Sequence, residues 1–155
     1  MTDEDFLREA IKLAVSSASG VGGPFGAVVA IDGRVVAQGS NRVTAENDPT
    51  LHAEIVAIRA ACRKVGSFLL GGAVLYSSCE PCPMCFGAAY WARVDRIVHA
   101  ATRLDAAAAG FDDAAIYADI EVPPEQRALT TVRILASEGG RPFEAWAANP
   151  DRVPY

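Results

Sequence analysis

The sequence predicts an α/β fold, a three-layer α/β/α sandwich that the 155 residues form as one domain, 1–155. Segments with helical spacing of apolar residues alternate with short apolar runs bounded by turn residues, which is the pattern of a sheet covered by helices. The length suits one hydrophobic core. The composition, 51% hydrophobic and 21% charged, is that of a globular chain.

The first half of the chain predicts a helix followed by a hairpin. Residues 3–19 form an amphipathic helix, with Gly20 as its stop signal and apolar residues at helical spacing: Phe6, Ala10, Leu13 and Ala14. After the turn "GVGGPFG", the run "AVVAIDGRVVAQGSN" predicts two strands joined at Asp32-Gly33, a dipeptide that favours a tight hairpin. The stretch "NRVTAENDPT" is then a polar loop.

The second half predicts three more strands, which brings the sheet to five. Residues 52–65 read as a helix, and "AVLYSS" as a buried strand. A helix from Cys82 to Ala92 follows, with prolines at its start, and then the strand "DRIVHAA". Residues 103–128 form a long connection with short helices, and "TTVRILAS" is the last strand. The segment "RPFEAWAANPDRVPY" is a short helix and a tail.

The net charge and the cysteines of the chain indicate which binding partners and which cellular compartment to expect. The formal net charge is −5, which argues against a nucleic acid partner, because phosphate binding usually requires a basic face. No stretch has the pattern of a secretory signal or the length of a membrane span. We therefore expect a cytoplasmic protein, in a reducing compartment where clustered cysteines bind metal or act in catalysis more often than they form disulfides.

Three of the four cysteines lie in "SSCEPCPMCFG", at Cys79, Cys82 and Cys85. Because Cys82 and Cys85 are three residues apart on a helix, their sulfurs share one face. Upstream, His52 and Glu54 open another helix, and together these residues spell H-x-E…P-C-x-x-C, the signature of zinc deaminases. Three ligands, His52, Cys82 and Cys85, would leave the fourth zinc position for water, with Glu54 as a proton carrier beside it.

Other interpretations of these residues stay open at this point. Cys79 could be a fourth ligand, which would make the zinc site structural and the protein a non-catalytic zinc-binding module. The pair Cys82 and Cys85 could be a redox pair, although nothing nearby suggests a thioredoxin-like unit. His99 and Cys62 are most simply an ordinary strand residue and a core residue.

On these motifs the whole chain resembles the cytidine deaminase-like superfamily and, within it, the bacterial guanine deaminases. The similarity includes "GGPFGAVV", "NDPTLHAEIVAIRAAC", "LYSSCEPCPMCFGAAYWAR", "DAAAAGFDDAAIY", "PFEAW" and the final tyrosine. The resemblance implies a mixed five-stranded sheet between helix layers and one Zn²⁺ held by His52, Cys82 and Cys85. It also implies that zinc-bound hydroxide attacks carbon 2 of guanine while Glu54 shuttles a proton, giving xanthine and ammonia.

The resemblance further implies a set of purine contacts. Asn41 would hydrogen-bond the base, Phe25 would stack on it, and Asp113 would bind the amino group and ring nitrogen 1. Ala53 and Trp91 would also line the pocket. From the residues alone, Phe25 is more simply a core aromatic and Asn41 a turn residue. Asp113, with its neighbour, could equally be a solvated pair or a helix cap, and Trp91 could be packing.

The resemblance implies a homodimer in which a C-terminal segment, about 141–155, is exchanged between copies. Tyr155 would then close the partner's active site, although a chain end is ordinarily frayed. The expected partner is a small purine base, with no nucleic acid and no membrane. The competing activities are deamination of a triazine such as ammeline, of cytosine, or of adenosine in tRNA.

Overall fold

The structure, a computed structural model, describes residues 1–155 and consists of two compact units, Met1–Asp113 and Ala114–Tyr155. We describe each unit by itself. The first unit contains a sheet with helices, and the second contains short helices only. No helix in the chain combines the length and the apolar character needed to cross a membrane.

The sheet of the first unit has four strands in the order β2-β1-β3-β4: β1 (Gly26–Ile31), β2 (Arg34–Ser40), β3 (Ala73–Cys79) and β4 (Arg96–Ala101). β1 runs antiparallel to β2 and β3, whereas β3 and β4 are parallel, so the sheet is mixed. Asp32 and Gly33 both have positive φ, 50° and 71°, as the predicted tight hairpin requires. A register shift after Val29 bends the hairpin.

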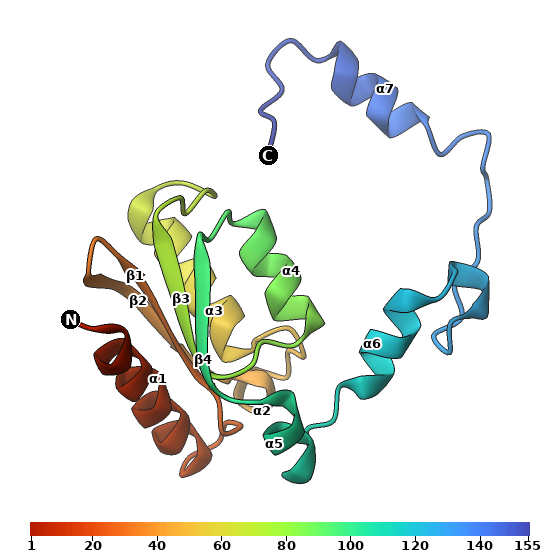
Figure 1. Ribbon diagram of the computed structural model, residues 1–155. Helices are drawn as coiled ribbons and strands as arrows, with labels where there is room; N and C mark the ends of the chain where they lie inside the picture. Colours follow the sequence, from red (N-terminus) through yellow and green to blue (C-terminus); the bar gives the residue numbers. More distant parts are fainter. The chain divides into compact units, whose positions relative to one another are not determined.

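Helix α1 (Asp3–Ala18) covers one face of the sheet (Figure 1). It begins with a capping box, in which Thr2 and Asp5 bind each other's backbone amides. Its buried side chains pack with strand residues in one cluster: Phe6, Ala10, Val28, Ala30 and Tyr76. The rings of Phe6 and Tyr76 stack with their centroids 4.8 Å apart. The expected helix at residues 3–19 is therefore present, and it faces the sheet as an amphipathic helix should.

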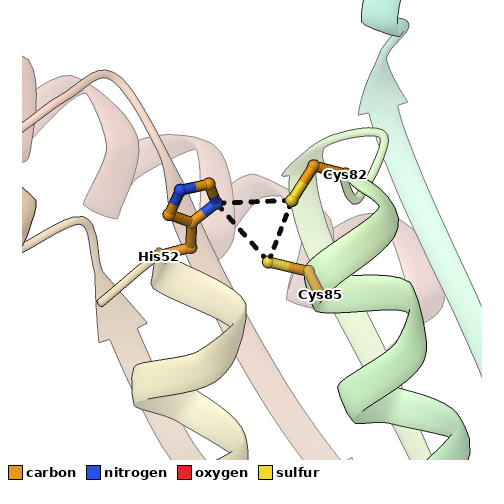
Figure 2. Close-up of side chains that lie close together, drawn as sticks. All are labelled: His52, Cys82 and Cys85. Atoms are coloured by element: carbon orange, nitrogen blue, oxygen red, sulfur yellow. Dashed lines mark hydrogen bonds between the residues drawn. The ribbon is translucent and has the colours of Figure 1, made fainter. Parts of the chain in front are cut away.

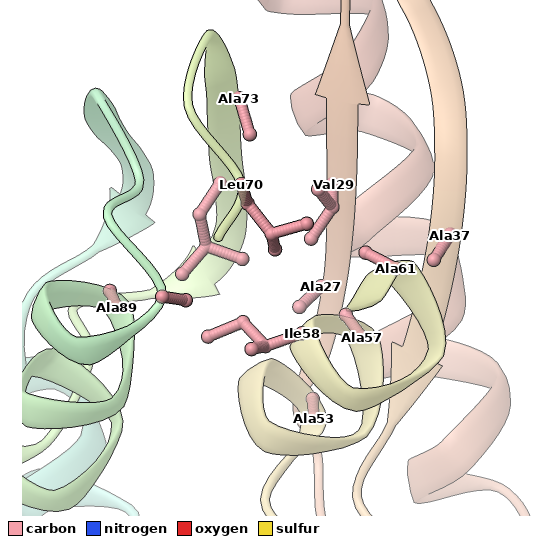
Figure 3. Packing of buried hydrophobic residues seen from close by; sticks show 12 residues of the cluster. Ala27, Val29, Ala37, Ala53, Ala57, Ile58, Ala61, Leu70, Ala73 and Ala89 are labelled. Carbon is pink, nitrogen blue, oxygen red and sulfur yellow. The ribbon is translucent and has the colours of Figure 1, made fainter. Parts of the chain in front are cut away.

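Helices α3 (Ala53–Val65) and α4 (Pro83–Trp91) cover the opposite face (Figure 1). The cluster beneath them consists mostly of alanine (Figure 3). Small side chains allow close packing, and at Gly39 on β2 the helix and the strand lie so close that an added Cβ would be 2.3 Å from the carbonyl oxygen of Ala53. The first turn of α3 is thus held directly against the sheet.

Short helices make up the remaining elements. In the first unit these are α2 (Val43–Glu46), which lies within the expected polar loop, and α5 (Arg103–Ala108). The second unit contains α6 (Ala114–Glu121), the 3₁₀ helix η1 (Pro124–Gln126) and α7 (Arg141–Ala148). None of its side chains is buried. Whether the two units act as the single domain expected from the sequence stays a prediction.

One expectation about the sheet was wrong, because the sheet has four strands and not five. The segment "TTVRILAS", residues 130–137, contains no strand. Its apolar residues Val132, Ile134 and Leu135 are 73%, 77% and 66% exposed. β-Branched residues favour strands because their side chains pack well on a pleated, half-buried surface. Without a partner strand and a buried face, these residues alone do not form a strand.

Candidate active site

Two helix starts from distant parts of the sequence meet in the first unit. His52 is the N-cap of α3, and Cys82 is the N-cap of α4, followed by Pro83 at the first helical position. Proline is suited to that position because it has no amide hydrogen to lose and its φ already fits a helix. Cys85 lies one turn into α4, so its sulfur is on the same side as that of Cys82.

The three donor atoms form a nearly equilateral triangle (Figure 2). His52 Nδ1 lies 3.5 Å from Cys82 Sγ and 3.6 Å from Cys85 Sγ, and the two sulfurs are 3.7 Å apart. A tetrahedral zinc ion, with its usual bond lengths, would place two sulfurs about 3.8 Å apart and a sulfur about 3.6 Å from a nitrogen. The triangle therefore fits zinc, and three protein ligands leave one tetrahedral position open.

The electrostatics at Cys82 also favour a metal ligand. The pKa of Cys82 is lowered to about 4, first by the hydrogen bond with Cys85 and then by the imidazole of His52, against the opposing effect of burial. The start of α4 adds the partial positive charge of a helix N-terminus. Thiolate is the form of cysteine that binds metals, so the site is prepared to hold a cation.

Glu54 lies in the first turn of α3 and is only 4% exposed. One carboxylate oxygen, Oε1, accepts a hydrogen bond of 2.8 Å from Ser77 Oγ, and the other, Oε2, lies 3.5 Å from Cys85 Sγ. Burial raises the pKa of Glu54 above its usual value. A carboxyl group with a raised pKa beside a metal centre can both accept and return a proton, which is the behaviour of a general acid–base.

Cys79 is not part of the ligand group, which consists of His52, Cys82 and Cys85. Its thiol instead donates to the backbone carbonyl of Thr102 at 3.4 Å, and burial raises its pKa, so it remains a thiol. The four-ligand, purely structural zinc site is therefore not what the structure contains. The redox interpretation of the pair also loses support, because an imidazole completes a metal triangle with it.

Asn41 lies at the end of β2, and it is buried, with 9% of its surface exposed. Its side-chain oxygen accepts two backbone hydrogen bonds, from the amides of Gly23 and Val43, both at 3.2 Å. Because the oxygen is engaged twice, the NH₂ group is the part of Asn41 that can bind a ligand. Ala53 is fully buried, and its amide is among those at a helix start that have no intrahelical partner.

Phe25 and Asp113, two more of the expected purine contacts, are both in the first unit. Phe25 is half-buried, and its ring meets that of Phe111 edge to face, with centroids 5.0 Å apart and an angle of 87°. Asp113 is half-buried, and its pKa is raised first by desolvation and then by the charge of Cys82. The contact of Asp113 with a substrate stays a prediction.

Two further expected site residues are exposed. Trp91 is the last residue of α4, at the opposite end of the helix from Cys82, and it is 62% exposed. Tyr155 ends the second unit and is 72% exposed. A contact of either residue with a substrate stays a prediction.

Two further residues were missed by the sequence analysis. Ser77 binds Glu54, and Phe111 supports Phe25. Alternation along β3 places Ser77 on the face that carries Leu75, which was a signal that this hydroxyl is buried and needs a partner. The partner itself lies 23 residues away on α3, and no local pattern reveals it.

Comparison with known proteins agrees with this geometry. Residues 1–101 match the family described as the cytidine and deoxycytidylate deaminase zinc-binding region. The chain is 50% identical to the guanine deaminase of Bacillus subtilis (strain 168) over 156 residues, covering 100% of both chains. The X-ray structure of guanine deaminase from Bacillus subtilis superposes with a TM-score of 0.97 at 47% identity, covering 100% of this chain and 99% of that one.

A more distant relative shares the zinc-binding part. The tRNA-specific adenosine deaminase of Bacillus subtilis (strain 168) is 40% identical over 99 residues, covering 64% of this chain and 62% of that protein. The full-length match, in contrast, extends through the second unit. With its three zinc ligands and its buried glutamate, the chain belongs to the cytidine and deoxycytidylate deaminase zinc-binding family and, within it, to the guanine deaminases.

Proposed function

We propose that this protein hydrolyses guanine to xanthine and ammonia, a reaction in the breakdown or salvage of purines. The observation that carries the proposal is the triangle of His52, Cys82 and Cys85 beside the buried Glu54, in a chain that matches a guanine deaminase along its whole length. Zinc held by the three ligands would lower the pKa of a bound water to about 7, which provides a nucleophile at neutral pH.

The side chains of the first unit supply the proton transfers. Glu54 accepts the proton of the water that attacks carbon 2, and passes it to ring nitrogen 3. Burial raises the pKa of Glu54, which makes its carboxylate a better proton acceptor than that of an exposed glutamate, and the resulting acid can return the proton. Water supplies the oxygen of xanthine, and the amino group leaves as ammonia, so the reaction needs no redox partner.

The polar groups that we propose as contacts of the base match the edges of guanine. Asn41 offers its NH₂ group as a donor, which requires an acceptor such as the carbonyl oxygen or an unprotonated ring nitrogen of the base. Asp113 offers carboxylate oxygens, which suit the amino group and the ring N–H. Phe25, whose ring packs edge to face with that of Phe111, offers an aromatic ring for stacking. Together they select a base with both acceptors and donors.

A substrate panel tests this assignment. The zinc-loaded protein is incubated with guanine, cytosine, adenosine, a tRNA and the triazine ammeline, and ammonia release is measured. We expect guanine to be deaminated fastest, with ammeline as a slower substrate, because its ring also has an N–C(–NH₂)–N edge. A faster reaction with tRNA would instead assign the activity of the tRNA-specific relative, against the acidic charge of the chain.

We further propose that the chain acts as a homodimer in the cytoplasm, with about residues 141–155 exchanged so that Tyr155 closes the partner's pocket. The support is that the second unit buries no side chain, although it carries large apolar residues such as Phe143 and Trp146. Apolar side chains exposed in such number usually mark a surface that another molecule covers. All four cysteines are free thiols, consistent with a reducing compartment.

A further inference from the structure

The two oxygens of the Glu54 carboxylate have different surroundings. Oε1 accepts the 2.8 Å hydrogen bond from Ser77, whereas Oε2 lies 3.5 Å from the sulfur of Cys85, on the side of the zinc ligands. Torsion about the last bond of a glutamate side chain is broad, so packing alone holds a carboxylate loosely. A hydrogen bond to one oxygen determines where the other one points.

The position of Ser77 in the fold suits it to fix the orientation of the Glu54 carboxylate. It is 1% exposed, and it lies on β3, which pairs with β1 on one side and with β4 on the other. Its backbone is paired opposite Ala27 and beside His99, so the residue sits in the interior of the sheet. Glu54, by contrast, is on the first turn of a helix. The Ser77 hydroxyl therefore connects α3, the helix that carries Glu54, to a strand in the interior of the sheet.

We propose that Ser77 is a positioning residue, whose hydroxyl holds Oε1 of Glu54 so that Oε2 faces the centre formed by His52, Cys82 and Cys85. The inference deepens the proposed function, because it rests on Glu54 as the proton carrier. Proton transfer requires heavy atoms within about 2.6–3.2 Å, and small displacements of the carrier are costly. Without the hydroxyl, Oε1 loses its donor in a buried site, and the carboxylate turns toward other polar groups.

The neighbouring residue provides a matched control. Ser78 is also a buried serine on β3, and its hydroxyl also makes one buried hydrogen bond, which it accepts from the amide of Gly26 at 3.1 Å. That bond ties β3 to the start of β1 and does not involve Glu54. Ser77→Ala and Ser78→Ala therefore each remove one buried hydroxyl from the same strand, but only the first releases Glu54.

The kinetic test uses the full-length, zinc-loaded protein. For Ser77→Ala we expect a fall in kcat of about 10- to 100-fold, as for the loss of a buried hydrogen bond to a charged group, with KM and zinc content within about twofold of the wild type. Ser77→Thr, which restores a hydroxyl, should recover kcat to within about threefold. Ser78→Ala should keep kcat within about threefold. Equal losses of kcat in both alanine variants would overturn the inference.

A double-mutant cycle separates positioning from a general structural effect. If Ser77 acts through Glu54, then adding Ser77→Ala to Glu54→Gln should lower the residual rate by no more than about twofold. A full additional loss, equal to that in the wild-type background, would show that Ser77 acts independently of Glu54 and would overturn the proposal.

Crystal structures of the zinc-loaded alanine variants give a readout that does not depend on activity. We expect the Glu54 carboxylate to be rotated or to occupy several orientations in Ser77→Ala, and to keep its orientation in Ser78→Ala. An unchanged carboxylate in Ser77→Ala would refute the role of Ser77. If the wild-type protein released no ammonia from guanine, the proposed function would fail, while this structural comparison would still decide whether Ser77 orients Glu54.

Discussion

The two units of the chain use similar apolar residues in different ways. In Met1–Asp113, apolar side chains pack from both faces of a sheet into two buried clusters. In Ala114–Tyr155 the large apolar side chains, among them Leu129, Ile134 and Trp146, are exposed. Local hydrogen bonds shape that second unit, for example those that Asp119 accepts from the amides of Ala128 and Leu129.

This difference in burial between the two units indicates which of them holds the residues of the candidate active site in place. The zinc ligands, Glu54 and the residues that hold them belong to the first unit, where buried packing fixes side-chain positions. The second unit lacks a core of its own, so we expect it to contribute to binding and assembly. The following predictions test this division, beginning with the largest effect.

Loss of a zinc ligand should abolish activity. In Cys82→Ser the triangle of donors loses the thiolate, and we expect the protein to lose both its zinc and all measurable deamination. Cys79→Ser is the matched control, because Cys79 bonds to the Thr102 carbonyl and not to the ligand group. Metal analysis by atomic absorption should find one zinc per chain in Cys79→Ser. Zinc loss in that control would restore the four-ligand interpretation.

Removal of the proton carrier should abolish most of the activity while sparing the metal. Glu54→Gln keeps the size of the side chain but cannot accept a proton, so we expect turnover of guanine to fall by about 10²- to 10⁴-fold. Zinc content should be unchanged, since Glu54 is outside the ligand group. If zinc were lost together with activity, Glu54 would be a ligand and the proposed proton transfer would be wrong.

Asp113 should matter more than its neighbour Asp112. We expect Asp113→Asn to lower kcat/KM for guanine by about 100-fold, because the substrate's donors lose a charged acceptor, with the fold and the zinc content intact. Asp112→Asn removes the adjacent, exposed carboxylate and should have an effect of less than about threefold. Steady-state kinetics of both variants decide the matter, and near-normal turnover in Asp113→Asn would exclude its proposed role.

Removal of the last two residues, Pro154 and Tyr155, tests whether the second unit completes a partner's site. We expect KM for guanine to rise about tenfold, equivalent to about 1.4 kcal/mol of binding, with no loss of zinc. Unfolding and refolding the truncated protein together with Glu54→Gln should restore activity, because mixed dimers join an intact zinc site to an intact tail. No recovery on mixing, or a fully active monomer by light scattering, would contradict the exchange.

The smallest effect should come from the exposed ion pair between Asp3 and Arg96. Arg96 and the Tyr76 hydroxyl donate to Asp3 and lower the pKa of its carboxyl to about 2. Because the folded pKa is below the ordinary 3.8, the stabilisation by Asp3 is present above pH 4 and is lost as the pH falls toward 2. Asp3→Asn should lower the urea midpoint at pH 6, and should lower it less at pH 2.5, where part of the stabilisation by Asp3 is already lost. An equal difference at both pH values would count against this ion pair.

Much of the candidate site could be predicted from the sequence because its signals are local. The spacing of His52 and Glu54, and of Cys82 and Cys85, is set by two helix starts, and helix geometry alone brings each pair onto one side. The hairpin at Asp32-Gly33 and the helix at the N-terminus likewise follow from short patterns. The same reasoning from local patterns wrongly predicted a strand at "TTVRILAS", because the segment has the residue pattern of a strand but no neighbouring strand to pair with.

The sequence by itself thus determined the zinc ligands and the α/β layering of the first unit, and it singled out Glu54 as the expected proton carrier. Only the tertiary structure decided which atoms meet across the sheet. It engages Cys79 with Thr102, joins Ser77 to Glu54, and sets Phe111 against Phe25. It also decided that the sheet ends at four strands. The reason is physical: spacing within a helix or turn is a property of the backbone, whereas contacts between distant segments depend on how complete elements pack.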